Sequence, residues 1–267
     1  TALKCKKLRR SFQERDPSVF PLLAVSWKAR KGEVALRTYL AVDIGASSGR
    51  HILGWIEGGN LRLEEVYRFE NKLVTKNGRL CWDTENLAEE VLRGLERCRE
   101  LSKIPDSVGI DTWAVDYVLL DKEGGVLGDT VAYRDSRTQG MDQLVESLIS
   151  AQELYARTGI QKQDFNTIYQ LMAVKTQEPE LLEQAQRLLM VPEYLTYRLT
   201  GKMESEYTNA TTTGLVNAQT RTWDWELLDR LDYPRRLFGE LRLPGSVVGH
   251  FAPEIKARVG FDCQVLF

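Results

Sequence analysis

The chain has 267 residues and a mass of 30.5 kDa, and its 43% hydrophobic and 28% charged residues are typical of an ordinary globular protein. A net charge of −2 and a pI near 5.9 argue against nucleic acid or an anionic membrane as the main partner. The four cysteines lie far apart without a C-x-x-C pair, which argues against a zinc site or a disulfide scaffold, and no apolar run reaches membrane-spanning length, so we expect a cytoplasmic protein.

Residues 1–37 form a basic N-terminal extension. They contain ten Lys or Arg and three acidic residues, a net charge of +7, and they show no sustained strand or helix period. A targeting segment is one interpretation of such a composition. The simpler interpretation, which we favour, is that the extension lies outside the fold and that one domain spans residues 38–267.

The first half of this domain has the apolar patterns of strands, with one helical stretch whose apolar residues recur three and four positions apart. Strands are predicted over 39–44, 50–56, 61–69, 107–111 and 117–120, and a helix over 84–101, capped by Asp83 or Thr84. The order β-β-β-α-β-β predicts an α/β fold with a mixed sheet rather than a doubly wound parallel one.

The second half of the domain reads as mostly helical. Helices are predicted over 141–156, 168–177, 180–189, 192–199, 223–231 and 253–259, separated by glycines and prolines. Residues 205–214 are polar and are predicted to form turns. The chain is therefore expected to have a mixed β-sheet core followed by a helical second half.

The first motif with chemical content lies between the first two predicted strands. The apolar run Leu40–Ile44 carries one carboxylate, Asp43, and is followed by Gly-Ala-Ser-Ser-Gly-Arg at 45–50. A buried strand does not hold an uncompensated carboxylate, and the N–H groups of a Gly-rich turn can bind an anion. With Arg50 across the turn, the pattern favours a phosphate-binding hairpin in which Asp43 holds Mg²⁺ through water. An ordinary hairpin turn remains the alternative.

The second motif is Gly-Ile-Asp-Thr-Trp-Ala-Val-Asp-Tyr at 109–117. Asp111 lies where an apolar strand ends, and ligands of α/β sheets gather beyond such carboxyl ends. Carboxylate oxygens accept hydrogen bonds from sugar hydroxyls, and an indole such as Trp113 can cover the C–H side of a sugar. The pattern therefore indicates a sugar site, although a turn-capping Asp111 with Trp113 in the core is equally open.

The third motif is Tyr-Arg-Asp-Ser-Arg-Thr at 133–138. Arg134 and Arg137 flank Asp135, so a mutual salt-bridge cluster is the simplest interpretation. We favour this structural role for Arg137. For Arg134 a position lining a sugar cleft stays open.

Together these segments resemble the FGGY family of carbohydrate kinases and, within it, the kinases of L-rhamnulose. The resemblance rests on residues 43–50, 109–117, 132–138, 197–203 and 207–213, and extends from about Leu40 to about residue 262. It implies the ribonuclease-H-like core shared with actin-like ATPases. It also implies phosphorylation of L-rhamnulose, or a related ketose, to the 1-phosphate with ATP and Mg²⁺.

The resemblance also implies roles for individual residues. The family's ATP-binding turn falls on Ala46, Ser47, Ser48, Gly49 and Arg50, and its Mg²⁺-associated carboxylate falls on Asp43. The residues expected on the substrate side are Asp111, Trp113, Ala114, Asp116 and Arg134. Ala114 stands where the family has a glycine that contacts the substrate, so an added methyl group is expected to narrow the pocket.

The family's catalytic base has no match in the chain. That base is the Asp of a His-Asp-Thr motif, which accepts the proton of the attacking hydroxyl, but neither His51 nor His250 is followed by Asp. We therefore expect the chain to be the sugar-binding first domain, with the base beyond Phe267, the second, ATP-binding domain absent, and no activity alone. The alternative is a free-standing, non-catalytic module that binds a sugar or a phosphate.

Overall fold

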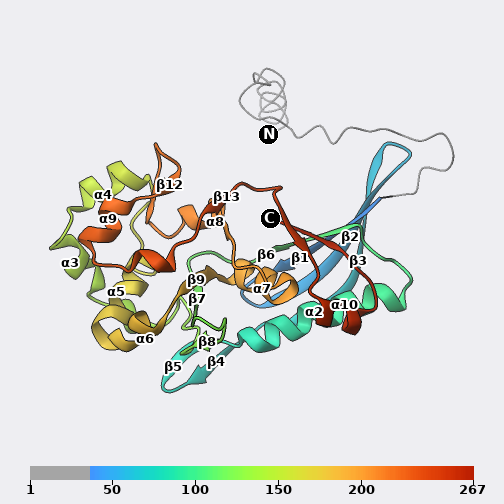
Figure 1. Ribbon diagram of the computed structural model, residues 1–267, viewed down its shortest axis with the longest axis horizontal. Helices are drawn as coiled ribbons and strands as arrows, with labels where there is room; N and C mark the ends of the chain where they lie inside the picture. The colour runs from blue at the N-terminus through green and yellow to red at the C-terminus, as the bar shows by residue number, and fades with distance from the viewer. Residues whose placement is uncertain (1–36) are drawn as a thin grey trace, which may run out of the picture. The chain divides into compact units, whose positions relative to one another are not determined.

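The computed structural model describes residues 37–267 of the chain (Figure 1). The prediction that the basic extension lies outside the fold concerns residues 1–37, of which 1–36 are outside the described residues. Within the described range, no helix combines the length and the apolar character that a membrane crossing requires.

The core of the structure is a six-stranded sheet in the order β14-β15-β6-β1-β2-β3. Its strands are β1 (Thr38–Ile44), β2 (Ser48–Glu57), β3 (Asn60–Glu70), β6 (Ser107–Asp111), β14 (Val247–His250) and β15 (Gln264–Leu266). Strands β1, β6 and β15 run parallel to one another, whereas β2 is antiparallel to both β1 and β3, and β14 to β15. The predicted α/β fold with a mixed sheet is confirmed.

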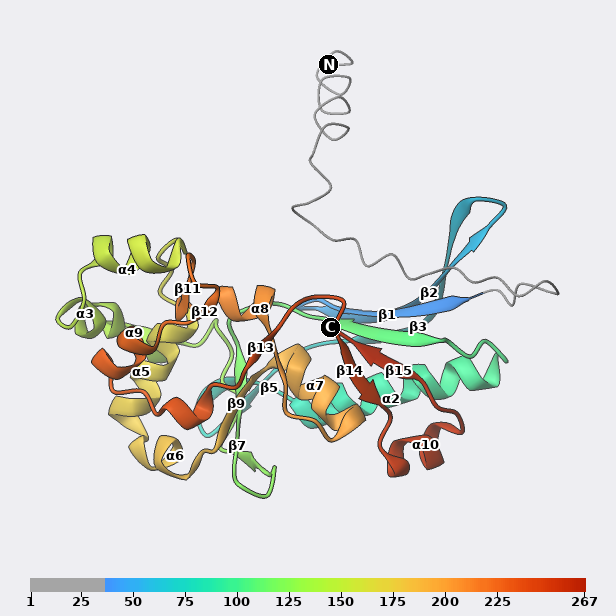
Figure 2. The ribbon, with the colours of Figure 1, turned by 45° about the horizontal axis from the view of Figure 1, so that its top comes forward.

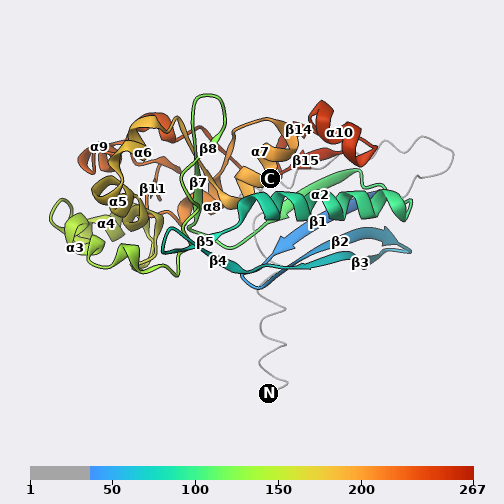
Figure 3. The ribbon, with the colours of Figure 1, turned by 90° about the horizontal axis from the view of Figure 1, so that it is seen from below.

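Three helices lie on the same side of this sheet: α2 (Thr84–Glu100), α7 (Val191–Thr200) and α10 (Pro253–Val259) (Figures 2 and 3). Helix α2 begins after Asp83, whose carboxylate accepts a hydrogen bond from the Asn86 N–H, so Asp83 rather than Thr84 is the cap.

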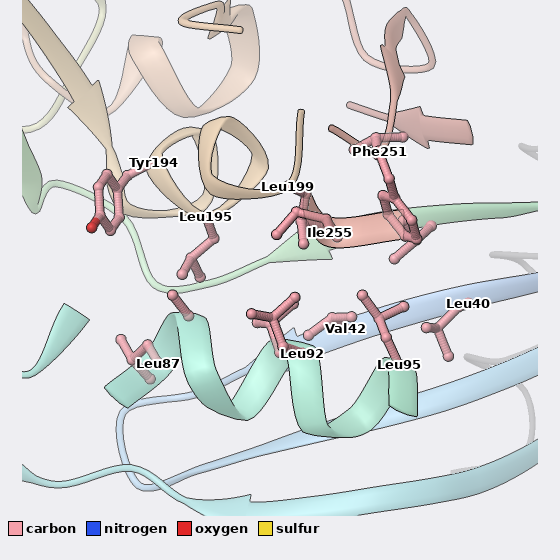
Figure 4. Packing of buried hydrophobic residues seen from close by; sticks show 14 of the residues in the cluster. Leu40, Val42, Leu87, Leu92, Leu95, Tyr194, Leu195, Leu199, Phe251 and Ile255 are labelled. Atoms are coloured by element: carbon pink, nitrogen blue, oxygen red, sulfur yellow. The ribbon is translucent and has the colours of Figure 1, made fainter. Parts of the chain in front are cut away.

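Burial of apolar side chains holds these helices to the sheet. Leu92 and Leu95 of α2 pack in one cluster with Val42 of β1, Leu199 of α7 and Ile255 of α10 (Figure 4). Each fully buried leucine contributes roughly 2 kcal/mol by leaving water. Apolar spacing in the sequence therefore predicts both the helix and the face that it buries.

One polar group lies inside this core. His51 of β2 is fully buried against α2, and its ring fills the space above Gly94, where an added Cβ would lie 2.2 Å from Nε2. Nε2 lies 3.1 Å from the Val91 carbonyl oxygen, while Nδ1 has no partner within residues 37–267. Burial lowers the pKa of His51 from 6.5 to about 4.

The remaining elements are short helices and small sheets, many of which contribute to a second apolar cluster. The helices are α3 (Met141–Glu146), α4 (Ala151–Thr158), α5 (Thr167–Gln177), α6 (Pro179–Gln184), α8 (Tyr207–Thr211) and α9 (Trp225–Arg230), with 3-10 turns at Ser136–Thr138 and Arg235–Leu237. The small sheets are formed by β4 (Leu73–Lys76) with β5 (Arg79–Trp82), by β7 (Tyr117–Leu120) with β8 (Val126–Leu127) and β9 (Arg187–Met190), by β10 (Ser205–Glu206) with β13 (Leu241–Arg242), and by β11 (Val216–Asn217) with β12 (Thr222–Trp223).

The structure differs from the predicted elements in several places, and the largest difference is that strands β14 and β15, two of the six strands of the main sheet, were not predicted. The predicted helix 141–156 is interrupted at Ser150, which caps α4, and the predicted helix 180–189 ends at Gln184 before strand β9 begins. The polar stretch 205–214 contains the short helix α8, and the β4–β5 hairpin was not predicted. Short apolar runs such as that of β9 fit helix and strand equally well, so periodicity does not separate them.

Candidate functional site

A row of charged side chains crosses three neighbouring strands of the main sheet at the end where β1 and β6 finish. Asp43 at the end of β1 is paired in register with Arg50 on β2 and with Asp111 at the end of β6. The Arg50 Nε donates to Asp43 Oδ2 at 2.9 Å, and both side chains keep nearly half of their surface exposed. The structure therefore brings together the carboxylate, the cation and the strand-end aspartate that the sequence singled out.

Asp111 is the carboxylate of this row that lacks a cationic partner among the described residues. Its pKa is raised above the ordinary value, first by partial burial and then by the neighbouring Asp43 carboxylate, while a backbone hydrogen bond from Thr112 lowers it. Two neighbouring carboxylates with one arginine carry an excess negative charge, which a bound cation could neutralise.

The turn between β1 and β2 is closed by a residue that the sequence analysis did not single out. The Gly45 N–H donates to the Ser48 carbonyl at 2.8 Å, and Asn71 donates from its backbone to Ser47 and from its side chain to Gly45. The backbone N–H groups of Ala46 and Ser47 have no acceptor within residues 37–267. A turn with free N–H groups can bind an anion.

A left-handed backbone conformation does not explain the two glycines of the turn. Neither Gly45 nor Gly49 has the positive φ that would require glycine. Gly49 is buried under Phe69, and an added Cβ would lie 2.1 Å from the phenyl ring. The assignment of Gly49 to a tight turn is therefore corrected: close packing requires it there.

A cavity of about 530 Å³ opens beside the charged row. Of the predicted site residues, Asp43, Asp111 and Ala114 line it, and the turn residues 46–50, Trp113, Asp116 and Arg134 do not. The opposite wall comes from α7 and α8 and includes Glu193, Glu206, Thr208, Asn209 and Thr212.

Glu193 and Glu206 are buried acids that the sequence analysis missed as site residues. Glu206 caps α8 by accepting from the N–H groups of Thr208 and Asn209, at 2.8 Å each. Glu193 is almost fully buried, and burial raises its pKa to about 8, with a smaller contribution from the Glu206 carboxylate. Both oxygens of Glu193 accept hydrogen bonds at 3.2 Å, Oε1 from the Glu206 N–H and Oε2 from the Asn209 amide. An acid inside the apolar stretch Val191–Leu195 was the available signal.

Asp116 lies beneath the site rather than in it. It is 0% exposed, and its carboxylate accepts from Trp82 Nε1 at 2.6 Å, Trp113 Nε1 at 2.9 Å, Gln170 Nε2 at 2.9 Å and the Tyr133 N–H at 3.1 Å. Burial raises its pKa, and these donors offset part of that rise.

The Asp116 carboxylate orients two stacked indoles. Trp82 and Trp113 lie with ring centroids 4.0 Å apart, Trp82 buried and Trp113 half-buried. Trp82 comes from the hairpin that was not predicted, so its pairing with Trp113 was not expected. Asp116 thus fixes the orientation of the indole that was expected to face the sugar.

The third motif is arranged differently from the expected salt-bridge cluster. Asp135 pairs with Arg79, at 3.3 Å, and caps the Ser136–Thr138 turn through the Arg137 N–H. Arg134 is exposed and lies over the Tyr133 ring, 5.4 Å from its centroid. Arg137 is buried, as the structural interpretation expected, but it forms no ion pair with Asp135.

The donor set fits a magnesium ion only if phosphates and water complete it. Within residues 37–267 no group of three or more His, Cys, Asp or Glu side chains is close enough to hold a metal ion. Mg²⁺ in kinase sites is usually held by one or two carboxylates together with substrate phosphates and waters. The Asp43–Asp111 pair, in which one carboxylate raises the pKa of the other, fits that description.

Comparisons with known proteins place the chain in a family. Residues 38–267 match the N-terminal domain of the FGGY family of carbohydrate kinases. A rhamnulokinase of Oceanobacillus iheyensis is 50% identical over 227 residues, which are 85% of this chain and 48% of that protein. A rhamnulokinase of Halalkalibacterium halodurans is 49% identical over 228 residues, again 85% and 48%. The chain thus spans about half the length of these relatives.

Solved structures show the same fold at lower identity. A gluconate kinase from Lactobacillus acidophilus has a TM-score of 0.77 and 24% identity, covering 87% of this chain and 47% of that one. A ligand-bound xylulose kinase from the same organism has a TM-score of 0.76, also at 24% identity, covering 86% and 47%. The ribonuclease-H-like, actin-like fold predicted for the chain is therefore confirmed.

Proposed function

Because the chain belongs to the FGGY family of carbohydrate kinases, we propose that it supplies the sugar-binding half of an enzyme that phosphorylates L-rhamnulose to L-rhamnulose 1-phosphate with ATP. The ketose is taken from relatives that are 50% and 49% identical over the matched half and are named rhamnulokinases. The cytoplasmic location stays a prediction.

The observation that carries the proposal is the charged row beside the cavity. Phosphoryl transfer depends on positioning and on electrostatic stabilisation of charge that develops on the phosphoryl group. Arg50, held by Asp43 at 2.9 Å, and the free N–H groups of Ala46 and Ser47 offer such stabilisation next to Asp43, which itself lines the cavity. Ser48 and Gly49 support the turn in its place.

Mg²⁺, when bound, would neutralise phosphate charge on the side of Asp43 and Asp111. These two carboxylates are the residues that would hold it, directly or through water. Arg50 would at the same time keep Asp43 oriented, since their ion pair fixes the carboxylate at the strand end.

The sugar is proposed to lie in the cavity of about 530 Å³ between the sheet edge and α8. Asp111 would accept from its hydroxyls, while on the facing wall the Asn209 amide, which donates to Glu193 Oε2 at 3.2 Å, keeps a second N–H as a donor. Ala114 would bound the space for the ketose. Trp113 and Arg134 remain proposed contacts at the rim, and Asp116 would act only by holding Trp113.

The catalytic base is not supplied by the residues of this chain in the form that the family resemblance implies, because neither histidine precedes an aspartate. Loss of a general base typically costs about 10²–10⁴-fold in rate. We therefore expect the 267-residue chain alone to bind the ketose but to show no ketose-dependent ATP turnover.

A chimera tests the proposal directly. Residues 38–267 would replace the matching half of the Oceanobacillus iheyensis rhamnulokinase, and turnover would be measured with L-rhamnulose, gluconate and xylulose in a coupled ADP assay. We expect L-rhamnulose to be phosphorylated with the highest kcat/KM. The controls are the unchanged parent enzyme and a parent enzyme that carries only the sequence changes needed at the junctions.

Two results would contradict the proposal. A folded chimera that prefers gluconate or xylulose would assign a different sugar to the cavity. A folded chimera that binds L-rhamnulose without phosphorylating it, while the parent is active, would favour the non-catalytic binding module.

A further inference from the structure

A second polar cavity of about 240 Å³ lies away from the proposed kinase site and shares no lining residue with it. It is enclosed by β5, β7, β8, α5 and α6. The polar side chains around it are Asn77, Arg79, Tyr117, Asp129, Arg137 and Glu178. A space of this size is far larger than a single bound water requires.

Arg137 is a buried cation whose hydrogen bonds are incomplete. It is 8% exposed, and one terminal nitrogen donates to Gln170 Oε1 at 2.8 Å, while its buried Nε has no acceptor within residues 37–267. No carboxylate of these residues lies within 4.0 Å of its guanidinium. Gln170 also donates to Asp116, so an amide links the Arg137 guanidinium to that carboxylate. A buried cation left in this way is costly unless something accepts from it.

Tyr117 has the same deficiency in the same cavity. It begins β7 and is 6% exposed, and its hydroxyl has no hydrogen-bond partner among the described residues. Buried tyrosines normally place the hydroxyl against an acceptor. Tyr233, which donates to the Ile168 carbonyl at 2.7 Å, shows that usual arrangement nearby.

The other charged side chains around the cavity differ in how many hydrogen-bond partners they have. Asp129 accepts from Asn77 at 2.9 Å, and Arg79 is shared between Asp135 and Gln177. The Glu178 carboxylate makes no side-chain hydrogen bond within residues 37–267 and lines the same space. The groups with unused capacity are thus two donors, on Arg137 and Tyr117, the carboxylate of Glu178, and the second oxygen of Asp129.

We propose that this cavity is a binding site for a small oxyanion, a phosphate or carboxylate group carried by a hydroxylated metabolite. The oxyanion accepts from Arg137 Nε and the Tyr117 hydroxyl, and a hydroxyl of the same ligand donates to Glu178. An arginine prefers oxyanions because its planar N–H groups match their geometry. The site does not depend on the proposed kinase function, because its residues are separate from the charged row.

Inorganic phosphate and glycolate are the two probes, and they distinguish a phosphate ligand from a carboxylate ligand. Their dissociation constants would be measured by titration calorimetry on the 267-residue protein, against chloride at equal ionic strength. The main variant is Tyr117→Phe, which removes a hydroxyl without a protein partner and therefore leaves folding intact. We expect at least one probe to bind and this variant to weaken it about 10-fold.

Matched variants separate this site from the rest of the molecule. Tyr233→Phe removes a buried hydroxyl elsewhere and should leave probe binding unchanged. Arg50→Ala removes the cation of the hairpin, so any phosphate bound there should be lost, while the site at Arg137 should keep its wild-type affinity for the probe. Arg137→Gln should abolish binding if the variant remains folded by circular dichroism.

Three outcomes would overturn the inference. One is that neither probe binds more tightly than chloride. Another is that Tyr117→Phe binds both probes as the wild type does. The third is that Arg50→Ala alone abolishes binding, which would place the anion at the hairpin turn.

Discussion

Asp111 and Asp116 stand five positions apart in one motif, and their surroundings are opposite. Asp111 is exposed at the cavity, next to a second carboxylate, and accepts only one hydrogen bond, from the Thr112 backbone, so it keeps acceptor capacity for a ligand. Asp116 is 0% exposed and accepts from two indoles, an amide and a backbone N–H. The same residue type therefore serves a ligand in one place and the architecture in the other.

The difference shows that unused hydrogen-bonding capacity, more than residue type, distinguishes a binding residue from a structural one. A carboxylate with four protein donors has no capacity left for a substrate. A carboxylate that faces another carboxylate gains from a cation or from hydroxyl donors. The same criterion identifies the cavity around Arg137 and Tyr117, where donors are left over.

The largest effect is expected from removing the saturated carboxylate. Asp116→Ala leaves four buried donors without their acceptor, so the free energy of unfolding should fall by about 3–5 kcal/mol. Asp111→Ala should change it by only about 0.5 kcal/mol, because this side chain is exposed. Urea unfolding of both variants measures the contrast. Equal losses would remove the distinction between the two aspartates.

The sequence predicted the parts of this contrast that depend on local pattern. Strand β6 and the row of Asp43, Arg50 and Asp111 follow from apolar runs that end in charged residues. The β4–β5 hairpin was missed although Asn77-Gly78 is a typical hairpin turn, with φ of 48° and 77°. Its strands have only four residues each, too few for a clear period.

The burial of Asp116 could not be predicted from local pattern. Its donors come from positions up to 54 residues away in the chain, and only the folded arrangement brings Trp82 and Gln170 to it. Glu193 and Glu206 meet across α7 and α8 for the same reason. Contacts between distant segments decide which carboxylates have all their hydrogen bonds made within the protein. Local sequence pattern does not predict these contacts.

His51 extends the comparison to a buried group whose hydrogen bonds are incomplete. Its pKa is about 4 in the folded protein and ordinarily 6.5, so below pH 6.5 the unfolded chain takes up a proton that the folded chain does not. The free energy of unfolding should therefore fall by about 3 kcal/mol as the pH drops from 6.5 through 4.

The measurement for His51 is a difference between pH profiles. His51→Gln keeps a nitrogen able to donate to the Val91 carbonyl but does not titrate, so its stability should depend less steeply on pH in this range. His250→Gln, at an exposed histidine, is the matched control and should follow the wild type. Identical profiles for His51→Gln and wild type would show that His51 is protonated without cost.

On the exposed side of the comparison, Arg50→Ala tests the cation of the charged row. In the chimera with the Oceanobacillus iheyensis enzyme, kcat should fall about 10²-fold while the KM for L-rhamnulose changes little, because the guanidinium acts on charge that develops during transfer. Arg62→Ala, at an equally exposed cation paired with Glu57, should leave kcat unchanged. A kcat within a few-fold of the parental chimera would exclude a role of Arg50 in phosphoryl transfer.

The smallest expected effect concerns Asp111 itself and decides whether its carboxylate oxygens bind the sugar. Asp111→Asn exchanges a charged acceptor for a neutral one that accepts at a single atom, so the KM for L-rhamnulose in the chimera should rise about five-fold with kcat nearly unchanged. Asp232→Asn, at an exposed acid outside the cavity, is the matched control.

Ala114→Gly should leave KM for L-rhamnulose nearly the same and broaden the range of ketoses accepted, because it removes one methyl group from the cavity wall. If Asp111→Asn left KM unchanged while Ala114→Gly altered it, the sugar would contact the cavity wall at residue 114 but not the strand-end carboxylate, and Asp111 would belong to the metal side alone.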